Sequence, residues 1–152
     1  MKRDEFLNTI SRGLILVCAG SCVVACSTSD DSGGGTTPPP TPTPSSGTKV
    51  SVALSRLSSV GDQVTTGGVL FFRIATGDTA SSFVATEAIC PHQGGALIWK
   101  ATDNKIQCQL HFAEYSTSGT VLQGPQGSSG NTRTLEIYAK VIENGNLVAT
   151  VS

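Results

Sequence analysis

The sequence CPHQGGALIWKATDNKIQCQLHFAEY, residues 90–115, decides how this chain folds and what it can bind. It contains both histidines of the chain, His92 and His111. Three of the five cysteines lie within the first 26 residues, so only Cys90 and Cys108 remain in the rest of the chain. One thiol and one imidazole stand in each of two short segments, spaced Cys-x-His and Cys-x-x-His, with fifteen residues between the pairs. Thiolate is a soft metal ligand and imidazole a borderline one, and both bind transition metals. This stretch therefore predicts a metal site.

Short apolar or alternating runs, separated by turn residues, continue from Lys49 to the end of the chain. This pattern is typical of an antiparallel β domain without long helices. The expected strands cover residues 50–54, 69–74, 83–88, 97–99, 105–107, 114–117, 135–142 and 147–151. Asn144-Gly145 predicts a type I′ hairpin before the last strand. A second turn, at residues 102–104, would place the two Cys/His segments side by side.

The first 25 residues are predicted to be an export signal. Basic residues precede an apolar run, Leu14 to Ala25, that is too short to cross a membrane as a helix. The run ends Val23-Val24-Ala25-Cys26, which resembles the lipobox of bacterial lipoproteins, in which the cysteine is lipidated and begins the mature chain. Cys26 is therefore expected to anchor an extracytoplasmic protein to a bacterial membrane, at the periplasmic face or on the outer membrane. A plain signal peptide or an uncleaved anchor helix are the alternatives.

Residues 26–48 after the expected signal are rich in Ser, Gly and Pro and cannot form a core, so they are predicted to be a spacer. The β domain is expected at residues 49–152, which is long enough for one modest core. The formal net charge is −1 and charged residues make up 14% of the chain. No basic field is present to attract nucleic acid, so nucleic-acid binding is not expected.

Two kinds of metal site use two cysteines and two histidines. A structural zinc ion would take all four ligands in a tetrahedron, and the chain would then be a zinc-binding surface lipoprotein with a binding role. Zinc-finger spacing, however, groups two cysteines and then two histidines, whereas here each segment has one of each. The spacing resembles the Rieske family, which holds a 2Fe-2S cluster with Cys-x-His and Cys-x-x-His loops.

The resemblance extends over nearly the whole domain and implies an all-β, Rieske-type antiparallel domain with a small cluster-binding subdomain of two ligand loops. It implies that Cys90 and Cys108 hold the inner iron, and that His92 and His111 hold the outer one. Tyr115 stands where the family often has an aromatic whose hydroxyl contacts a ligand sulfur. Residues 119–125 resemble the family's covering loop, in which Pro125 would cover the cluster.

The chain departs from the cytochrome bc type of Rieske protein at three positions. Those members carry a disulfide between the two loops, and the matching positions here are Gly95 and Leu110. They also place a serine two residues after the second histidine, where this chain has Ala113. A disulfide brace and a hydrogen bond to the cluster are therefore expected to be absent, which predicts a reduction potential in the middle or lower part of the Rieske range of roughly −150 to +300 mV.

The resemblance implies a one-electron carrier with no catalytic site of its own, because both histidines are already used as ligands. Its partners would be a quinol-linked or soluble donor and an acceptor protein. A closely related hypothesis makes the chain the Rieske subunit of a larger respiratory or other oxidoreductase.

Overall fold

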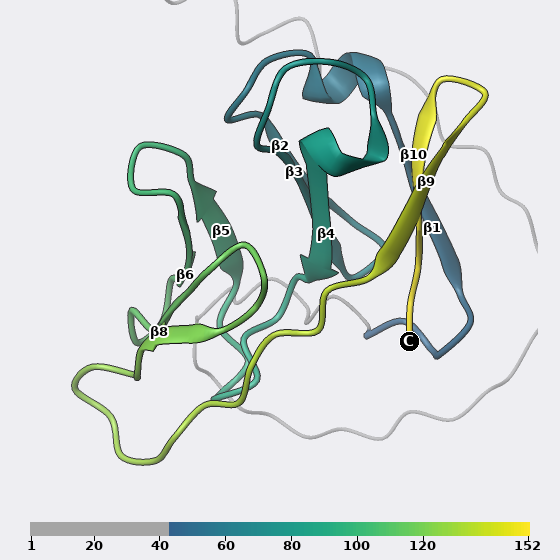
Figure 1. The fold of residues 1–152 in the computed structure, drawn as a ribbon. Helices are drawn as coiled ribbons and strands as arrows, with labels where there is room; N and C mark the ends of the chain where they lie inside the picture. The colour runs from purple at the N-terminus through teal and green to yellow at the C-terminus, as the bar shows by residue number, and fades with distance from the viewer. Residues whose placement is uncertain (1–42) are drawn as a thin grey trace, which may run out of the picture. The chain divides into compact units, whose positions relative to one another are not determined.

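The computed structural model describes residues 43–152, and these form a domain built of β-strands (Figure 1). The expected signal peptide, Cys26 and most of the spacer lie outside the described residues. Two short 3-10 turns are present, η1 (Leu54–Leu57) and η2 (Ala80–Ser82), and the described part contains no α-helix. The strands are β1 (Lys49–Ala53), β2 (Gln63–Thr66), β3 (Val69–Arg73), β4 (Phe83–Glu87), β5 (Leu97–Lys100), β6 (Lys105–Cys108), β7 (Glu114–Tyr115), β8 (Val121–Gln123), β9 (Ala139–Glu143) and β10 (Asn146–Thr150).

The strands form three sheets, and all of their pairings are antiparallel, which confirms the predicted antiparallel β class. Their strand orders are β1-β10-β9, β2-β3-β4 and β5-β6-β7-β8. In Figure 1 the sheet of β2, β3 and β4 occupies the middle of the domain, with the β5–β8 sheet on one side and the β1-β10-β9 sheet on the other. The β5–β8 sheet is the small subdomain that contains both Cys/His segments.

The central strand of the middle sheet, β3, is buried on both faces, and four of its five residues are apolar. β3 reads VLFFR, and all five residues are buried. Successive side chains of a strand point to opposite faces. Accordingly, Leu70 and Phe72 pack in the core shared with the β5–β8 sheet, whereas Val69 and Phe71 pack in the core shared with the β1-β10-β9 sheet. The domain therefore has two cores, and one of them lies directly under the Cys/His segments.

The expected strand at residues 135–142 is wrong in its first half. β9 begins only at Ala139, and the preceding segment makes an isolated bridge between Ile137 and Thr86. Leu135 belongs to the core under the Cys/His segments, but Tyr138 belongs to the other core. The segment crosses from one core to the other. Its apolar residues are therefore buried in two different cores and do not form one face of a single strand. Beyond the crossing the alternation changes phase, and Val141 is 48% exposed.

Two strands, β2 and β8, were not predicted from the sequence. Both are short, and β8 has no buried side chain. A strand without a buried face has no alternating apolar pattern to reveal it. The two predicted turns are present: Asn144 and Gly145 have φ angles of 49° and 75°, and Asn104 in the β5–β6 turn has a φ of 51°.

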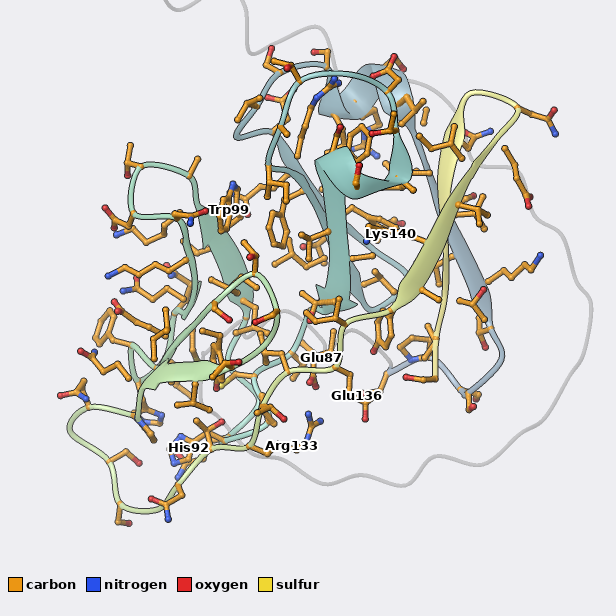
Figure 2. The ribbon with its side chains drawn as sticks, in the orientation of Figure 1. Glu87, His92, Trp99, Arg133, Glu136 and Lys140 are labelled. Atoms are coloured by element: carbon orange, nitrogen blue, oxygen red, sulfur yellow. The ribbon has the colours of Figure 1, made fainter. Side chains whose placement is uncertain are left out.

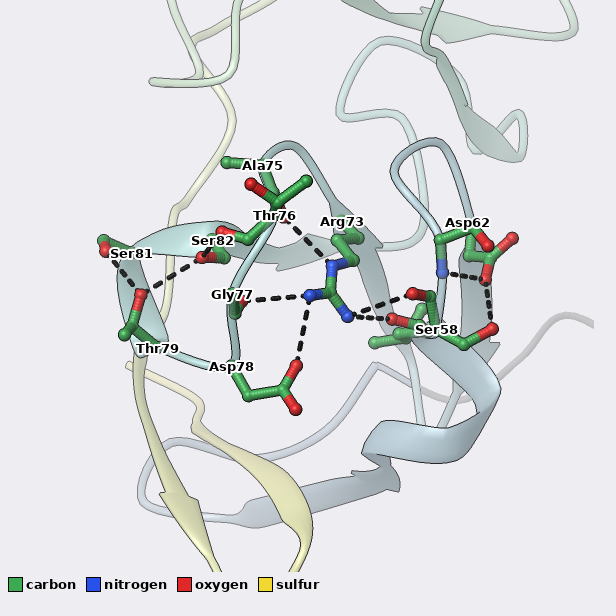
Figure 3. Close-up of polar contacts among 12 residues, drawn as sticks. Ser58, Asp62, Arg73, Ala75, Thr76, Gly77, Asp78, Thr79, Ser81 and Ser82 are labelled. Atoms are coloured by element: carbon green, nitrogen blue, oxygen red, sulfur yellow. Dashed lines mark hydrogen bonds and ion pairs between the residues drawn. The ribbon is translucent and has the colours of Figure 1, made fainter.

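Arg73, at the end of β3, ties together the loops around the middle sheet (Figure 3). Its guanidinium donates hydrogen bonds to four carbonyls and pairs with the Asp78 carboxylate at 3.1 Å; the four acceptors belong to Leu57, Ser58, Ala75 and Gly77. The group also lies 5.0 Å above the Phe83 ring. A buried arginine is tolerated only when its donors are satisfied, and here they are. We assign Arg73 a structural role.

Candidate metal centre

Two loops of the β5–β8 subdomain repeat one hydrogen-bonding pattern. In the first, Cys90–Gly95, the Cys90 N–H donates to the Gly95 carbonyl at 2.7 Å, and the Gly94 N–H donates to the Cys90 carbonyl at 3.0 Å. Gly94 has a φ of 78°, which turns the chain back on itself. Positive φ is easy for glycine, so the sequence of this loop fits its shape.

The second loop, Cys108–Ala113, uses the same two bonds. The Cys108 N–H donates to the Ala113 carbonyl at 2.8 Å, and the Phe112 N–H donates to the Cys108 carbonyl at 3.1 Å. The residue with positive φ is now Phe112, at 55°. Each loop thus begins at a cysteine, turns at the fifth residue and closes at the sixth.

The β5–β6 hairpin holds the two loops side by side. Leu97 pairs with Cys108 in the register of these strands, and the Gln109 N–H donates to the Ala96 carbonyl at 2.9 Å. This is the arrangement that the turn at residues 102–104 predicted.

Both cysteines are free and buried, with 2% exposure for Cys90 and 1% for Cys108. Burial raises the pKa of the Cys90 thiol, and the neighbouring Cys108 adds to this rise. Hydrogen bonds from the Tyr115 hydroxyl and the His92 backbone N–H act in the opposite direction on the pKa. Two adjacent buried thiols are unfavourable as bare thiolates, whereas a cation between them would favour their deprotonation.

The two histidine rings lie next to each other, with their centroids 5.1 Å apart and their planes at 78°. The Nδ1 atoms of His92 and His111 are buried and have no hydrogen-bond partner among the described residues. The Nε2 atom of His92 lies 3.1 Å from the Ser129 carbonyl. A carbonyl only accepts, so Nε2 is the donor in this contact, and in the neutral tautomer that donates here Nδ1 carries a lone pair. Buried polar atoms without a partner are rare, and a lone pair of this kind is what a metal ion takes.

The donor set therefore fits a cluster with two thiolates and two imidazoles. Among residues 43–152, no group of three or more His, Cys, Asp or Glu side chains is arranged to hold a single metal ion.

Residues 124–132, which overlap only the end of the covering loop expected at residues 119–125, contact both Cys/His loops and are called the covering loop below. Its Gln126 N–H donates to the His111 carbonyl at 2.7 Å, and its Ser129 carbonyl accepts from His92. Pro125, which was expected to cover the cluster, is half-buried next to Gln126. Figure 2 shows His92 on this side of the subdomain.

Tyr115 lies fully buried behind the first loop. Its hydroxyl is 3.3 Å from the Cys90 sulfur and 2.6 Å from the Thr132 hydroxyl. Burial raises the pKa of Tyr115 well above its ordinary value, so the hydroxyl keeps its proton. The sequence predicted the contact of Tyr115 with a ligand sulfur but not the contact with Thr132. Thr132 lies seventeen residues further along the chain, in a segment without periodicity, and no sequence signal points to it.

Gly95 and Leu110, the two positions at which the resemblance predicted that a disulfide would be absent, are in close contact. A methyl group built at Gly95 would lie 2.6 Å from the Leu110 Cβ and 2.7 Å from the Cys108 sulfur. The two loops therefore approach each other more closely than side chains on both would permit. Ala113, at the expected serine position, is fully buried and offers no hydroxyl.

Comparison with known proteins identifies this architecture. The family described as the Rieske [2Fe-2S] domain matches residues 52–142, which is more than half of the chain. The chain belongs to the Rieske family, and its domain is a 2Fe-2S electron-transfer domain.

Relatives with similar sequences are iron-sulfur subunits of cytochrome b6-f complexes. Subunit 2 from Synechocystis strain PCC 6803 is 30% identical over 70 residues, which is 44% of this chain and 39% of that subunit. The subunit from Chlorobaculum tepidum is 32% identical over 71 residues, which is 47% of this chain and 36% of the subunit. The chain thus matches well under half of the length of these relatives.

Two solved structures share the fold. The plasma membrane Rieske protein PetC3 from Synechocystis PCC 6803 superposes with a TM-score of 0.52 and 25% identity, covering 67% of this chain and 99% of PetC3. The ferredoxin of carbazole 1,9a-dioxygenase from Nocardioides aromaticivorans has the same TM-score at 19% identity, covering 71% of this chain and all of the ferredoxin, and supports the fold alone.

Proposed function

We propose that Cys90, Cys108, His92 and His111 hold the 2Fe-2S cluster, with the thiolates on the inner iron and the imidazoles on the outer one. The observation that carries this assignment is the pair of buried Nδ1 atoms that have no hydrogen-bond partner in the described part of the chain, beside two adjacent buried thiols. The two ligand loops are equivalent in hydrogen bonding and meet at these four side chains.

The cluster supplies reversible one-electron transfer when it is bound. The side chains around it set how easily the electron is accepted. Two thiolates and two neutral imidazoles balance the positive charge of two ferric ions and two sulfides, so the oxidised site is neutral, whereas four thiolates would make it a dianion. A neutral site accepts an electron at a higher potential. Ala113 provides no hydrogen bond, so we propose a potential below that of bc-type centres.

Visible absorption and reduced-state EPR test the ligand assignment. Cys90→Ser and Cys108→Ser should lose the cluster signal, because each removes a thiolate from the inner iron. His92→Ala and His111→Ala should change the EPR spectrum or lose the outer iron. Gln109→Ala is the matched control, since Gln109 lies beside Cys108 with an exposed side chain and should leave the spectrum unchanged. An unaltered spectrum in either histidine variant would show that the assignment is wrong.

We further propose that the domain works outside the cytoplasmic membrane, anchored by lipid on Cys26 through the residue 26–48 spacer. The lipobox-like run before Cys26 supports this, as does the likeness to a plasma membrane Rieske protein. Among residues 43–152 there is no helix that is long and apolar enough to cross a membrane. Cys26→Ser should move the protein from the membrane fraction to the soluble fraction or leave it unprocessed. A variant that remains processed and membrane-bound would contradict the anchor.

The partners we propose are a quinol-linked or soluble electron donor and an acceptor protein, with the chain acting as a carrier or as a subunit of an oxidoreductase. The ligand loops and the covering loop contain no charged residue, and Leu110 and Phe112 beside His111 are 51% and 52% exposed. An uncharged, partly apolar surface favours an apolar partner surface and gives no electrostatic steering. Co-purification with a large subunit would favour the subunit role. A steep dependence of the electron-transfer rate on salt would contradict an uncharged docking surface.

A further inference from the structure

The Tyr115 hydroxyl has two hydrogen-bonding neighbours, and their distances differ strongly. The Thr132 hydroxyl is at 2.6 Å and the Cys90 sulfur is at 3.3 Å. Tyr115 has a single hydroxyl proton, so it can donate to only one of them. The direction of each bond can be assigned from the protons that the two neighbours carry.

The inference rests on the proposed function, in which Cys90 is a cluster ligand. A ligand sulfur is a thiolate without a proton and can only accept. Tyr115 must therefore be the donor to Cys90, and its oxygen is left as an acceptor. Thr132 must then donate to Tyr115. The alternative acceptor for the Thr132 proton, the Arg133 carbonyl, is at 3.4 Å and offers a much weaker bond.

Thr132 is held in place by an ion pair on the next residue. The two terminal nitrogens of Arg133 donate to the two carboxylate oxygens of Glu87 at 2.6 and 2.9 Å. Glu87 is the last residue of β4 and also accepts the Glu136 N–H at 3.0 Å. Figure 2 shows Arg133, Glu87 and Glu136 together at the point where the covering loop returns to the middle sheet. A bidentate pair fixes direction as well as distance, so the backbone at Thr132 has a defined position.

We propose that Thr132 is a positioning residue that directs the Tyr115 proton toward the Cys90 sulfur and thereby raises the reduction potential of the cluster. A hydroxyl that accepts one hydrogen bond becomes a stronger donor in the next. A stronger bond to the ligand sulfur stabilises the reduced, more negative site more than the oxidised one. Without the Thr132 hydroxyl, the Tyr115 O–H would be less polarised, and it would be free to rotate away from the Cys90 sulfur.

The test is a double-variant cycle read by protein-film voltammetry on the full-length protein. Thr132→Val removes the hydroxyl and keeps the side-chain shape, and Tyr115→Phe removes the bond to sulfur. Thr132→Ser retains a hydroxyl and is the matched control. Urea unfolding of each cluster-loaded, full-length variant checks that packing is preserved. Thr132→Val should lower the midpoint potential relative to the wild type, by less than Tyr115→Phe does. Thr132→Ser should have the midpoint potential of the wild type.

The cycle decides whether Thr132 acts through Tyr115. In the Tyr115→Phe background, Thr132→Val should produce no further shift. An equal shift in both backgrounds, a rise in potential, or an unchanged potential in Thr132→Val would overturn the inference. So would loss of the cluster in both Thr132→Val and Thr132→Ala while Tyr115→Phe retains it, because a group acting through Tyr115 cannot matter more than Tyr115 itself. A wild-type chain without a cluster signal would instead refute the proposed function.

Discussion

The two ligand loops have the same hydrogen-bonded frame but differ at the positions where that frame is tightest. At the fifth residue, which has positive φ, the first loop has Gly94 and the second has Phe112. At the sixth residue the first loop has Gly95, and the second has Ala113. The same loop backbone can therefore be formed by different side chains, and the residue type at each position depends on what else that position contacts.

The largest expected effect is at the sixth residue, because the two loops differ there in free space. Ala113 fits its methyl group into the core, whereas a methyl at Gly95 would lie 2.7 Å from the Cys108 sulfur. Gly95→Ala should therefore push the loops apart, cost about 1–3 kcal/mol in the free energy of unfolding, and reduce cluster occupancy. Urea unfolding and the absorbance per protein chain measure both.

Gly94→Ala is the control for that substitution. A methyl at Gly94 meets no atom of residues 43–152 within 4 Å, so only the positive φ of 78° opposes it there. This should cost about 1 kcal/mol and leave cluster occupancy unchanged. Full occupancy in Gly95→Ala, or loss of the cluster in Gly94→Ala, would mean that the contact with Cys108 does not distinguish the two positions.

A smaller effect is expected at the fifth residue of the second loop. Phe112 has a φ of 55° and a side chain that is 52% exposed, so it contributes little packing to offset the strain. Phe112→Val should destabilise the domain by about 1–2 kcal/mol, because a β-branched residue tolerates this region poorly. Phe112→Asn should lie within about 0.5 kcal/mol of the wild type, because asparagine adopts it readily. Equal unfolding free energies for the two variants would show that the φ angle is not the cause.

The smallest effect concerns the strands that enter and leave the second loop. Lys105 of β6 and Glu114 of β7 form an ion pair at 2.8 Å, whereas Ile89 and Ala96, which flank the first loop, pair without charges. The hydrogen bond from Lys105 lowers the pKa of Glu114 below its ordinary value of 4.5. The carboxylate therefore stabilises the fold above that value, and this contribution is lost as the pH falls through the lowered pKa.

Glu114→Gln should consequently lose stability less steeply than the wild type when the pH is lowered from about 5 to about 3, and should be slightly less stable at neutral pH. Thermal unfolding across this pH range measures the slope. Glu136→Gln is a suitable control, since Glu136 is exposed and makes no ion pair among the described residues. Parallel pH profiles for wild type and Glu114→Gln would contradict the assigned role of the pair.

Secondary structure was predicted correctly from the local sequence where a residue pattern had a single physical cause. The turn at Asn144-Gly145 was predictable because two adjacent positive φ angles favour those residue types, and the structure contains both. The strand expected at residues 135–142 failed because its apolar residues serve two cores. Alternation reports burial but does not say against which sheet a side chain is buried.

By itself the sequence determined the all-β class, the family and the side-by-side placement of the two Cys/His segments, because ligand types, their spacing and the intervening turn are local properties. Only the tertiary structure decided the contacts that surround these segments. The closeness of Gly95 to Cys108, the approach of Ser129 to His92, and the contact of Thr132 with Tyr115 all join residues distant in the chain. Such contacts depend on how separate loops pack, and packing leaves no periodic trace in the sequence.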